Sequence, residues 1–337
     1  MSGGAIITSG EHGCLFNNMP DCKTRRNNFG KKRNNQTVKL TKVTSIDDPA
    51  TSIEIENSLI LKHIPNYEDY FILIDEWCEN DEKPNGWQQC SLFKPGAQRV
   101  VRFMQMRMNY GGERLYEYAK NRRLLIENWL KIQIRVAEGL RNLHMRGWIH
   151  GDLHHGNIVV DDTNIARIID FGQSYTLSKL GLRDINLTFL PDFDNYAPEL
   201  DYAAGIKSGL STGDTMKIIF TKKKILHRID EIFPRQLGVY GDLANFSEFN
   251  NLSSDGDIVS FIKQYARASD IWTLGYNFFN LYMDLLVDNV YLQSNFYKKN
   301  HGEQMRVLYG MLHPDPRRRL TVDGLLKELY SLRMLWV

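Results

Sequence analysis

The stretch from His150 to Gly172 constrains the fold of this chain more than any other. It contains two short β-branched runs joined by a polar turn of Asp, Thr and Asn, and this pattern predicts a tight hairpin. One end of the hairpin carries Asp152 and Asn157, and the other carries Asp170. Phosphoryl transfer from a nucleotide needs such a set: one carboxylate orients the attacking hydroxyl, while an amide and a second carboxylate hold magnesium. A surface hairpin whose acids only form turns is the alternative.

The order HGDLHHGN followed by Asp-Phe-Gly resembles the protein-kinase signature. The resemblance implies that Asp152 is the catalytic base, that Asn157 and Asp170 bind the metal, and that His150 braces the loop. It implies a bilobal α+β fold, with a small five-stranded antiparallel lobe that carries one helix and a large, mainly helical lobe. We expect these lobes at residues 1–108 and 109–337, with an insertion at about 200–268.

The first residues predict a strand, a glycine-bearing turn and a second strand. Glycines there let backbone N–H groups approach phosphate oxygens. The turn resembles the kinase glycine-rich loop, although Thr8 occupies the place of its first glycine. The resemblance assigns ATP binding to Ser9, Gly10, Gly13 and Leu15, and an ordinary hairpin is the alternative.

A short strand at 37–40 carries Lys39, and a helix is expected over 52–63, with Ser52 as its N-cap. By resemblance, Lys39 neutralises the ATP phosphates and pairs with a glutamate of the helix. Glu56 is preferred to Glu54 because it precedes Leu59-Ile60 at the family's spacing. Residues two apart on a helix lie on opposed faces, so both cannot serve. A solubility lysine and a surface glutamate are the alternatives.

Two further strands, at 70–77 and 99–106, complete the small lobe, and paired glycines follow the second. A strand that breaks into paired glycines matches a hinge between lobes. By resemblance, Met106 is the gatekeeper beside the adenine, backbone groups of Arg107 and Met108 hold the adenine edge, and Glu113 reaches the ribose.

The large lobe carries three further kinase-like motifs, Ala-Pro-Glu ending at Glu199, the helix beginning at Asp270, and the late motif containing Arg319. Protein kinases bind a polypeptide substrate along the segment that ends in the first motif, and the resemblance implies a buried ion pair between Arg319 and Glu199. In the insertion, the sequence over 216–233 has helical periodicity and includes the basic run 222–224. We expect this run either to bind a substrate or partner or to form a packing surface.

Composition restricts the partners and the compartment. The formal net charge of +2 gives no clear indication of nucleic-acid binding. The N-terminus shows no signal peptide, and the apolar segment 271–287 contains polar residues that favour a buried core helix over a membrane span. Four cysteines without a CxxC pair fit neither a zinc site nor a disulfide framework and suit a reducing compartment. We therefore expect a cytoplasmic protein.

These features predict a serine/threonine protein kinase that uses ATP with Mg²⁺, for which Mn²⁺ could substitute, and acts on a protein substrate. His154 stands where such kinases carry lysine, so the loop also resembles aminoglycoside and other small-molecule phosphotransferases. Thr8 and His154 support a third alternative, a pseudokinase scaffold. When protonated, His154 would take part of the lysine's role and add pH dependence between about 6 and 7.

Two finer expectations follow. Gly151 precedes the catalytic aspartate where many regulated kinases carry arginine, so we expect activity without activation-loop phosphorylation. The chain most resembles kinases of large nucleocytoplasmic DNA viruses, which implies action in the host cytoplasm or the virion. This resemblance rests on Gly13–Phe16 with Pro20 and Cys22, Val38–Leu40 and Ile64–Tyr67.

Overall fold

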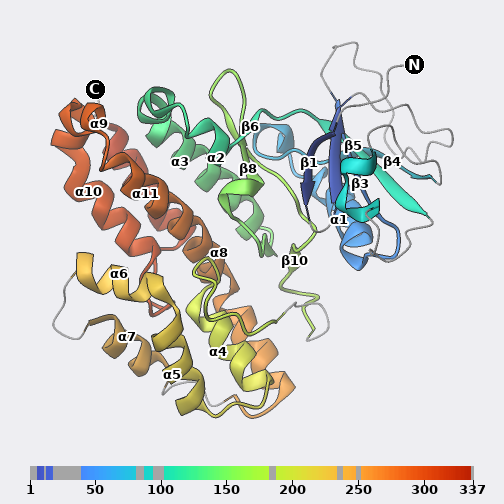
Figure 1. The fold of residues 1–337 in the computed structure, drawn as a ribbon. Helices are drawn as coiled ribbons and strands as arrows, with labels where there is room; N and C mark the ends of the chain where they lie inside the picture. The colour runs from blue at the N-terminus through green and yellow to red at the C-terminus, as the bar shows by residue number, and fades with distance from the viewer. Residues whose placement is uncertain are drawn as a thin grey trace. The chain divides into compact units, whose positions relative to one another are not determined.

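The computed structural model describes residues 6–10, 13–17, 39–80, 87–93, 102–181, 187–233, 238–247 and 252–334. The chain forms two compact units, coloured along the chain in Figure 1. Unit 1 comprises Met1–Gly112 and Arg167–Ser174, and unit 2 comprises Glu113–Ala166 and Tyr175–Val337. The sequence places the division after residue 108, whereas the contacts place it after Gly112 and assign 167–174 to unit 1.

The described residues of unit 1 form the predicted five-stranded antiparallel sheet and one α-helix. The strands follow the order β1-β2-β3-β5-β4. Their bounds are β1 Ile6–Gly10, β2 Gly13–Asn17, β3 Lys39–Ser45, β4 Ile74–Asn80 and β5 Phe103–Asn109. The helix α1 spans Pro49–Leu61, and three 3₁₀ turns are η1 Tyr67–Asp69, η2 Trp87–Gln89 and η3 Ser91–Phe93. The predicted fold class is thus confirmed for the small lobe.

Helix α1 begins earlier than the sequence analysis predicts. The side chain of Asp48 accepts a hydrogen bond from the backbone N–H of Ala50, and Pro49 occupies the first turn. An aspartate cap followed by proline is a favoured helix start, because proline lacks the N–H that would otherwise need a partner. Ser52, the predicted cap, lies inside the helix.

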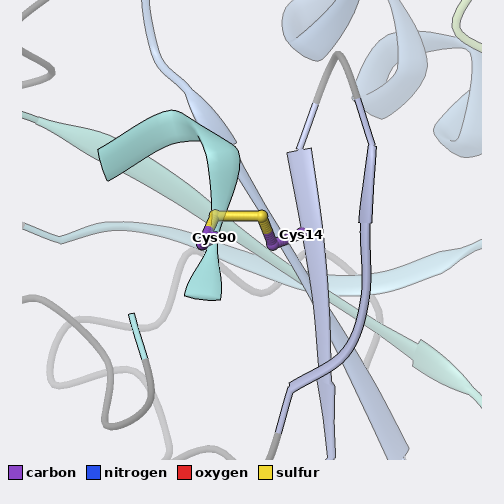
Figure 2. The surroundings of a disulfide bond; sticks show 2 residues. All are labelled: Cys14 and Cys90. Carbon is purple, nitrogen blue, oxygen red and sulfur yellow. A yellow bond between two sulfur atoms is a disulfide. The ribbon is translucent and has the colours of Figure 1, made fainter. Parts of the chain in front are cut away.

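A disulfide joins β2 to the segment before η3. Cys14 and Cys90 are bonded with their Cα atoms 5.8 Å apart, across a sequence separation of 76 residues (Figure 2). Both cysteines are buried in an apolar cluster with Phe16, Val43 and Phe103. Cys78 is also disulfide-bonded. The prediction that the cysteines form no disulfide framework is therefore wrong, because residues distant in sequence meet through the sheet.

Unit 2 is mainly helical, as predicted. Its helices are α2 Leu115–Tyr118, α3 Arg122–His144, α4 Pro198–Lys207, α5 Thr212–Lys222, α6 Lys224–Ile232, α7 Gly238–Ser247, α8 Asp255–Leu285, α9 Asn289–Gln293, α10 Asn295–Met311 and α11 Val322–Met334. Its short elements are β6 Glu113–Arg114, β7 Trp148–Ile149, η4 His155–Asn157, β8 Ile158–Val160 and β10 Tyr175–Thr176, and β9 Ala166–Ile168 continues into unit 1. Strand β10 pairs with β7, and β6 pairs with β8.

The long helix α8 is the centre of the unit 2 core. Ser254 caps it by accepting a hydrogen bond from the N–H of Asp257, so the helix begins well before the predicted start at residue 270. Trp129 of α3 packs its ring against Phe278 and Tyr282 of α8, with ring centroids 5.7 and 5.9 Å apart. Within the described ranges, no helix has the length and apolar character needed to cross a membrane.

The described residues of the insertion fold mainly into helices. The predicted helix over 216–233 is two helices, α5 and α6, because Lys223 between them has an extended backbone, with φ −80° and ψ 94°. Lys223 is also fully buried. A segment that contains a run of three lysines therefore turns its middle lysine into the core.

Candidate active site

Lys42, in the middle of β3, is paired with two carboxylates. Its Nζ lies 2.7 Å from Oε2 of Glu54 on α1 and 3.2 Å from Oδ2 of Asp170. All three residues belong to unit 1. The side chains of Lys42 and Glu54 are 18% and 7% exposed, whereas that of Asp170 is 41% exposed. The ammonium is thus held between one buried and one accessible carboxylate.

Burial and charge act in opposite directions on this group. At Lys42 burial disfavours the ammonium, but the carboxylates of Glu54 and Asp170 outweigh that effect, so its pKa is raised. Burial raises the pKa of Glu54 to about 7, against the attraction of Lys42. The lysine therefore stays charged, and the buried carboxylate completes the ion pair as the pH rises through neutrality.

The predicted pair of Lys39 with Glu56 is not formed, which corrects the sequence analysis. Nζ of Lys39 instead lies 2.9 Å from Oδ2 of Asp75, and Glu56 is exposed. Lysines three apart on a strand point to opposite faces, so only one can face the helix. The opposed-face rule for Glu54 and Glu56 holds, but Glu54 is the residue on the buried face of α1.

Asn57, which the sequence analysis did not identify, fixes the segment that carries Asp170. Its Nδ2 donates to the carbonyl oxygens of Phe171 and Ser174, each at 2.8 Å. Asn57 lies three residues after Glu54 and therefore on the same side of α1. Asp170 has φ +63°, a left-handed conformation that aspartate tolerates. The spacing of Glu54 and Asn57 was a usable signal, because residues three apart on a helix share a face.

Cross-strand register places two of the predicted ATP-binding residues beside Lys42. Leu15 on β2 and Met106 on β5 are each directly opposite Lys42 in the sheet. Directly opposite residues share a face, so all three lie in one row. Met106 is fully buried in a cluster with Ile55 of α1. Met108, two residues further along β5, is partly buried against the same cluster.

The glycine-bearing hairpin closes where predicted. Gly10 at the end of β1 is opposite Gly13 at the start of β2, and Ser9 precedes Gly10 in β1. Gly13 has φ +153°, and a Cβ atom there would come within 2.6 Å of the carbonyl oxygen of Val43. The close approach of β2 to β3 therefore requires glycine at this position.

In unit 2, Asp270 organises the loop that leads to Asp152. Its carboxylate accepts from the N–H groups of His150 and Gly151, each at 2.9 Å, and lies 3.0 Å from Nε2 of His144. His150 is fully buried, and its Nδ1 accepts from the N–H of Asp152 at 3.3 Å. Asp270 of α8 and the buried ring of His150 thus set the conformation of this loop.

Asn157 and His154 both turn toward Asp152. Nδ2 of Asn157 donates to the carbonyl oxygen and to Oδ2 of Asp152, at 2.9 and 3.2 Å. Nδ1 of His154 accepts from the N–H of Gly156 at 2.9 Å, which places the proton of the neutral ring on Nε2. That Nε2 lies 3.6 Å from Oδ2 of Asp152. Glu113, the predicted ribose contact, is exposed on β6.

The predicted metal ligands have the chemistry that magnesium requires. Both side-chain hydrogen bonds of Asn157 use its amide nitrogen Nδ2, so the amide oxygen is the side-chain atom it can offer to a cation. Asp170 offers an accessible carboxylate. No group of three or more His, Cys, Asp or Glu residues suited to a metal ion occurs among the described residues. Oxygens of these two kinds suit Mg²⁺, which binds through one or two protein carboxylates together with substrate phosphates.

The ion pair predicted between Glu199 and Arg319 is formed. Nη1 and Nη2 of Arg319 donate to Oε1 and Oε2 of Glu199 at 2.6 and 3.1 Å. Both side chains are fully buried. The bidentate pair fixes the start of α4, where the segment before it enters the helical core.

Parts of the chain are similar to known protein kinases. Residues 88–190 match the model of the protein tyrosine and serine/threonine kinase family. The chain is 30% identical over 124 residues to the probable serine/threonine-protein kinase MRK1 homolog of Encephalitozoon cuniculi, covering 36% of this chain and 38% of that protein. It is 30% identical over 134 residues to serine/threonine-protein kinase PSK1 of Saccharomyces cerevisiae, covering 38% of this chain and 9% of that protein.

A shorter match extends the same relationship. The chain is 38% identical over 60 residues to the proto-oncogene serine/threonine-protein kinase mos of Sus scrofa, covering 18% of this chain and 17% of that protein. The matched parts thus span well under two thirds of the length of these relatives.

Proposed function

Because the chain carries a protein kinase domain, we propose that it transfers the γ-phosphoryl group of ATP to a serine or threonine hydroxyl of a protein substrate. Asp152 orients the hydroxyl and accepts its proton. Lys42 takes the role that the sequence analysis gave to Lys39 and positions the ATP phosphates. Glu54 replaces Glu56 as its partner. The Gly10–Gly13 turn covers the phosphates with backbone N–H groups.

The observation that carries this proposal is the contact of Lys42 with both Glu54 and Asp170. A structural lysine needs one partner, and burying the Lys42–Glu54 pair costs desolvation free energy that packing alone would not require. Binding of a nucleoside triphosphate would account for this arrangement, because Lys42 could then contact phosphate oxygens and Asp170 could hold the cation. This set counts against a scaffold that has lost its catalytic groups.

Magnesium is the cofactor that the oxygen donors fit, and manganese could replace it. Asp170 and Asn157 would each supply one oxygen, and the bound ion would neutralise charge on the transferring phosphoryl group. Lys42 holds Asp170 in place from within unit 1. In unit 2, Asn157 is held by its own hydrogen bonds to Asp152.

The choice between a protein and a small molecule as acceptor rests on two features. The buried Glu199–Arg319 pair supports a protein acceptor, because it fixes the end of the segment along which protein kinases bind a polypeptide. His154 beside Asp152 favours a small-molecule phosphotransferase as the second candidate. A relation to viral kinases and action in the cytoplasm stay predictions.

The test is transfer of label from γ-labelled ATP with Mg²⁺ to a mixture of generic protein substrates. Lys42→Met and Asp170→Asn should each reduce incorporation by at least about 100-fold, as expected when phosphate or metal contacts are lost. Lys39→Met is the matched control, the same substitution three residues away, and should retain most activity. Equal loss in Lys39→Met and Lys42→Met would contradict the assignment.

The acceptor is decided in the same experiment. Label in protein serine or threonine establishes the proposed reaction. Label only in aminoglycosides or other small acceptors would establish the second candidate. ATP binding without turnover, in the presence of both acceptor classes, would establish the scaffold.

A further inference from the structure

Lys223 of the insertion is a buried cation outside the catalytic groups. It lies between α5 and α6 and its side chain is fully buried. Its Nζ donates to the carbonyl oxygens of Phe193 and Tyr196 at 3.0 and 2.8 Å and lies 2.7 Å from Oδ2 of Asp201. The ammonium thus donates two hydrogen bonds to backbone oxygens and forms an ion pair with a carboxylate.

The two backbone acceptors belong to one short stretch, residues 190–196, which precedes the Ala-Pro-Glu motif. This stretch makes two successive turns, since the N–H of Phe193 donates to Leu190 and the N–H of Tyr196 donates to Phe193. Oδ1 of Asp201 accepts from the N–H of Leu190 at 3.2 Å. The Lys223–Asp201 pair therefore holds both ends of the stretch.

The insertion holds the same stretch at a further point. Oδ1 of Asp194 accepts from the N–H of Ile225, in the first turn of α6, at 3.0 Å. The side chains of Leu190 and Phe193 are 45% and 51% exposed. The stretch is thus fixed through its backbone from beneath, while two apolar side chains face outward.

Helix α8 connects this stretch to the catalytic loop. Thr273 donates to the carbonyl oxygen of Asn195 at 3.1 Å. Nδ2 of Asn277 donates to Oδ1 of Asn195 at 2.8 Å, and Oδ1 of Asn277 accepts from the N–H of His155 at 3.1 Å. A displacement of residues 190–196 would therefore also act on the loop that carries Asp152.

Burying an ion pair costs desolvation free energy. Burial raises the pKa of Asp201 to about 6, against the opposing attraction of Lys223. An apolar pair of similar volume would pack as well and avoid the cost of desolvating two charges. An apolar pair cannot supply two directed hydrogen bonds to backbone oxygens together with an ion pair. The pair is therefore suited to fixing one backbone conformation.

We propose that Lys223 and Asp201 form a brace, built into the insertion, that sets residues 190–196 in the conformation that receives the protein substrate. Lys223 is a positioning residue in this proposal, which rests on the proposed function. The brace takes the place of a phosphate in the activation segment, whose usual arginine partner is replaced here by Gly151.

The variants separate positioning from folding. Lys223→Met alone strands the Asp201 carboxylate in the core and should destabilise unit 2. Lys223→Met combined with Asp201→Leu removes both charges, so stability should return toward that of the wild type. The double variant still lacks the bonds to Phe193, Tyr196 and Leu190. Lys224→Met, an exposed lysine next in sequence, is the matched control.

The kinetic measurement compares the KM for protein substrate with the KM for ATP. In the double variant we expect the KM for protein to rise at least about tenfold, since misplacing a binding segment can cost about 100-fold, while the KM for ATP stays within about twofold. Lys224→Met should match the wild type in both. Recovery of stability together with a normal KM for protein would overturn the brace.

Amide hydrogen exchange tests the brace without any activity. Exchange of the 190–196 amides should become faster in the double variant than in the wild type, with the amides of α3 unchanged. Unchanged exchange in 190–196 would overturn the proposal. If the wild type labels no protein, the proposed function fails, and the exchange measurement still decides whether the brace exists.

Discussion

Removing Arg319 should destabilise unit 2 strongly. In Arg319→Met, the carboxylate of Glu199 keeps its hydrogen bond from Oγ of Ser269, at 2.8 Å, but loses its only charged partner within the described contacts. The variant also removes donors from three backbone carbonyls, those of Ala268, His313 and Pro314. Breaking a fully buried pair from one side costs about 3–5 kcal/mol. For a domain of 150–250 residues this loss corresponds to roughly 6–20 °C in Tm.

Thermal and urea unfolding of wild type and variants measure this loss. Arg141→Met is the control, because its partner Asp323 and Arg141 itself are 67% and 47% exposed, and exposed pairs contribute at most about 1 kcal/mol. Adding Glu199→Gln to Arg319→Met should recover part of the loss, since no charge is then stranded. A loss below about 1 kcal/mol in Arg319→Met, equal to the control, would refute the reasoning.

Three further predictions concern other parts of the molecule. Burial raises the pKa of Glu54 from 4.5 to about 7, so the folded protein binds this proton more tightly than the unfolded chain does. The stability that the bound proton contributes should be lost as the pH rises from 4.5 to 7. Urea titrations at several pH values should show this decrease in the free energy of unfolding, and the decrease should be smaller in Glu54→Gln. Replacing Cys14 and Cys90 by alanine should lower the free energy of unfolding of unit 1 by about 4–5 kcal/mol under non-reducing conditions, from the entropy of a loop spanning 76 residues; an unchanged urea midpoint would contradict it. Phosphatase treatment should leave kcat/KM for protein substrate within about twofold of its starting value, because Gly151 offers no cation to a phosphate, and abolished activity would count against the prediction.

The parts of the site that the sequence predicted are those whose residues are close together in the chain. Asp152, Asn157 and Asp170 lie within one hairpin and its flanking loops, so spacing and residue type are sufficient to recognise them. The Glu199–Arg319 pair came from family motifs at both of its ends. The five-stranded sheet followed from its apolar runs, although β3 starts at Lys39 and extends to Ser45 rather than ending at residue 40.

The lysine assignment failed because it depends on register. Lys39 and Lys42 sit in similar apolar surroundings, and only the pairing of β3 with β2 and β5 decides which one faces α1. A one-residue shift in register moves every side chain to the other face of a sheet. Glu54 shares the buried face of α1 with Ser58 and Leu61, whereas the apolar residues Ile53 and Ile60 are exposed. The apolar pattern of this helix therefore indicated the wrong face.

The insertion shows a second limit of local patterns. Lys222, Lys223 and Lys224 form a basic run that favours an exposed surface, yet the middle one is fully buried. Its acceptors in residues 193 and 196 are 30 and 27 residues away in sequence. Burial of a single lysine within a charged run is a property of the tertiary contacts, and no periodicity within the run could indicate it.

The cysteines bear on where the protein acts. The expectation of a reducing compartment rested on four cysteines without a recognisable pairing pattern. That premise does not hold, because Cys14 and Cys90 meet through the packing of β2 against the segment before η3, and Cys78 is bonded as well. Disulfides persist in oxidising surroundings and are rare where thiols are kept reduced. The cysteines therefore give no support to the predicted cytoplasmic location. Because Cys14 directly follows Gly13, an environment that opens the Cys14–Cys90 bond would remove a restraint next to the hairpin proposed to cover the ATP phosphates.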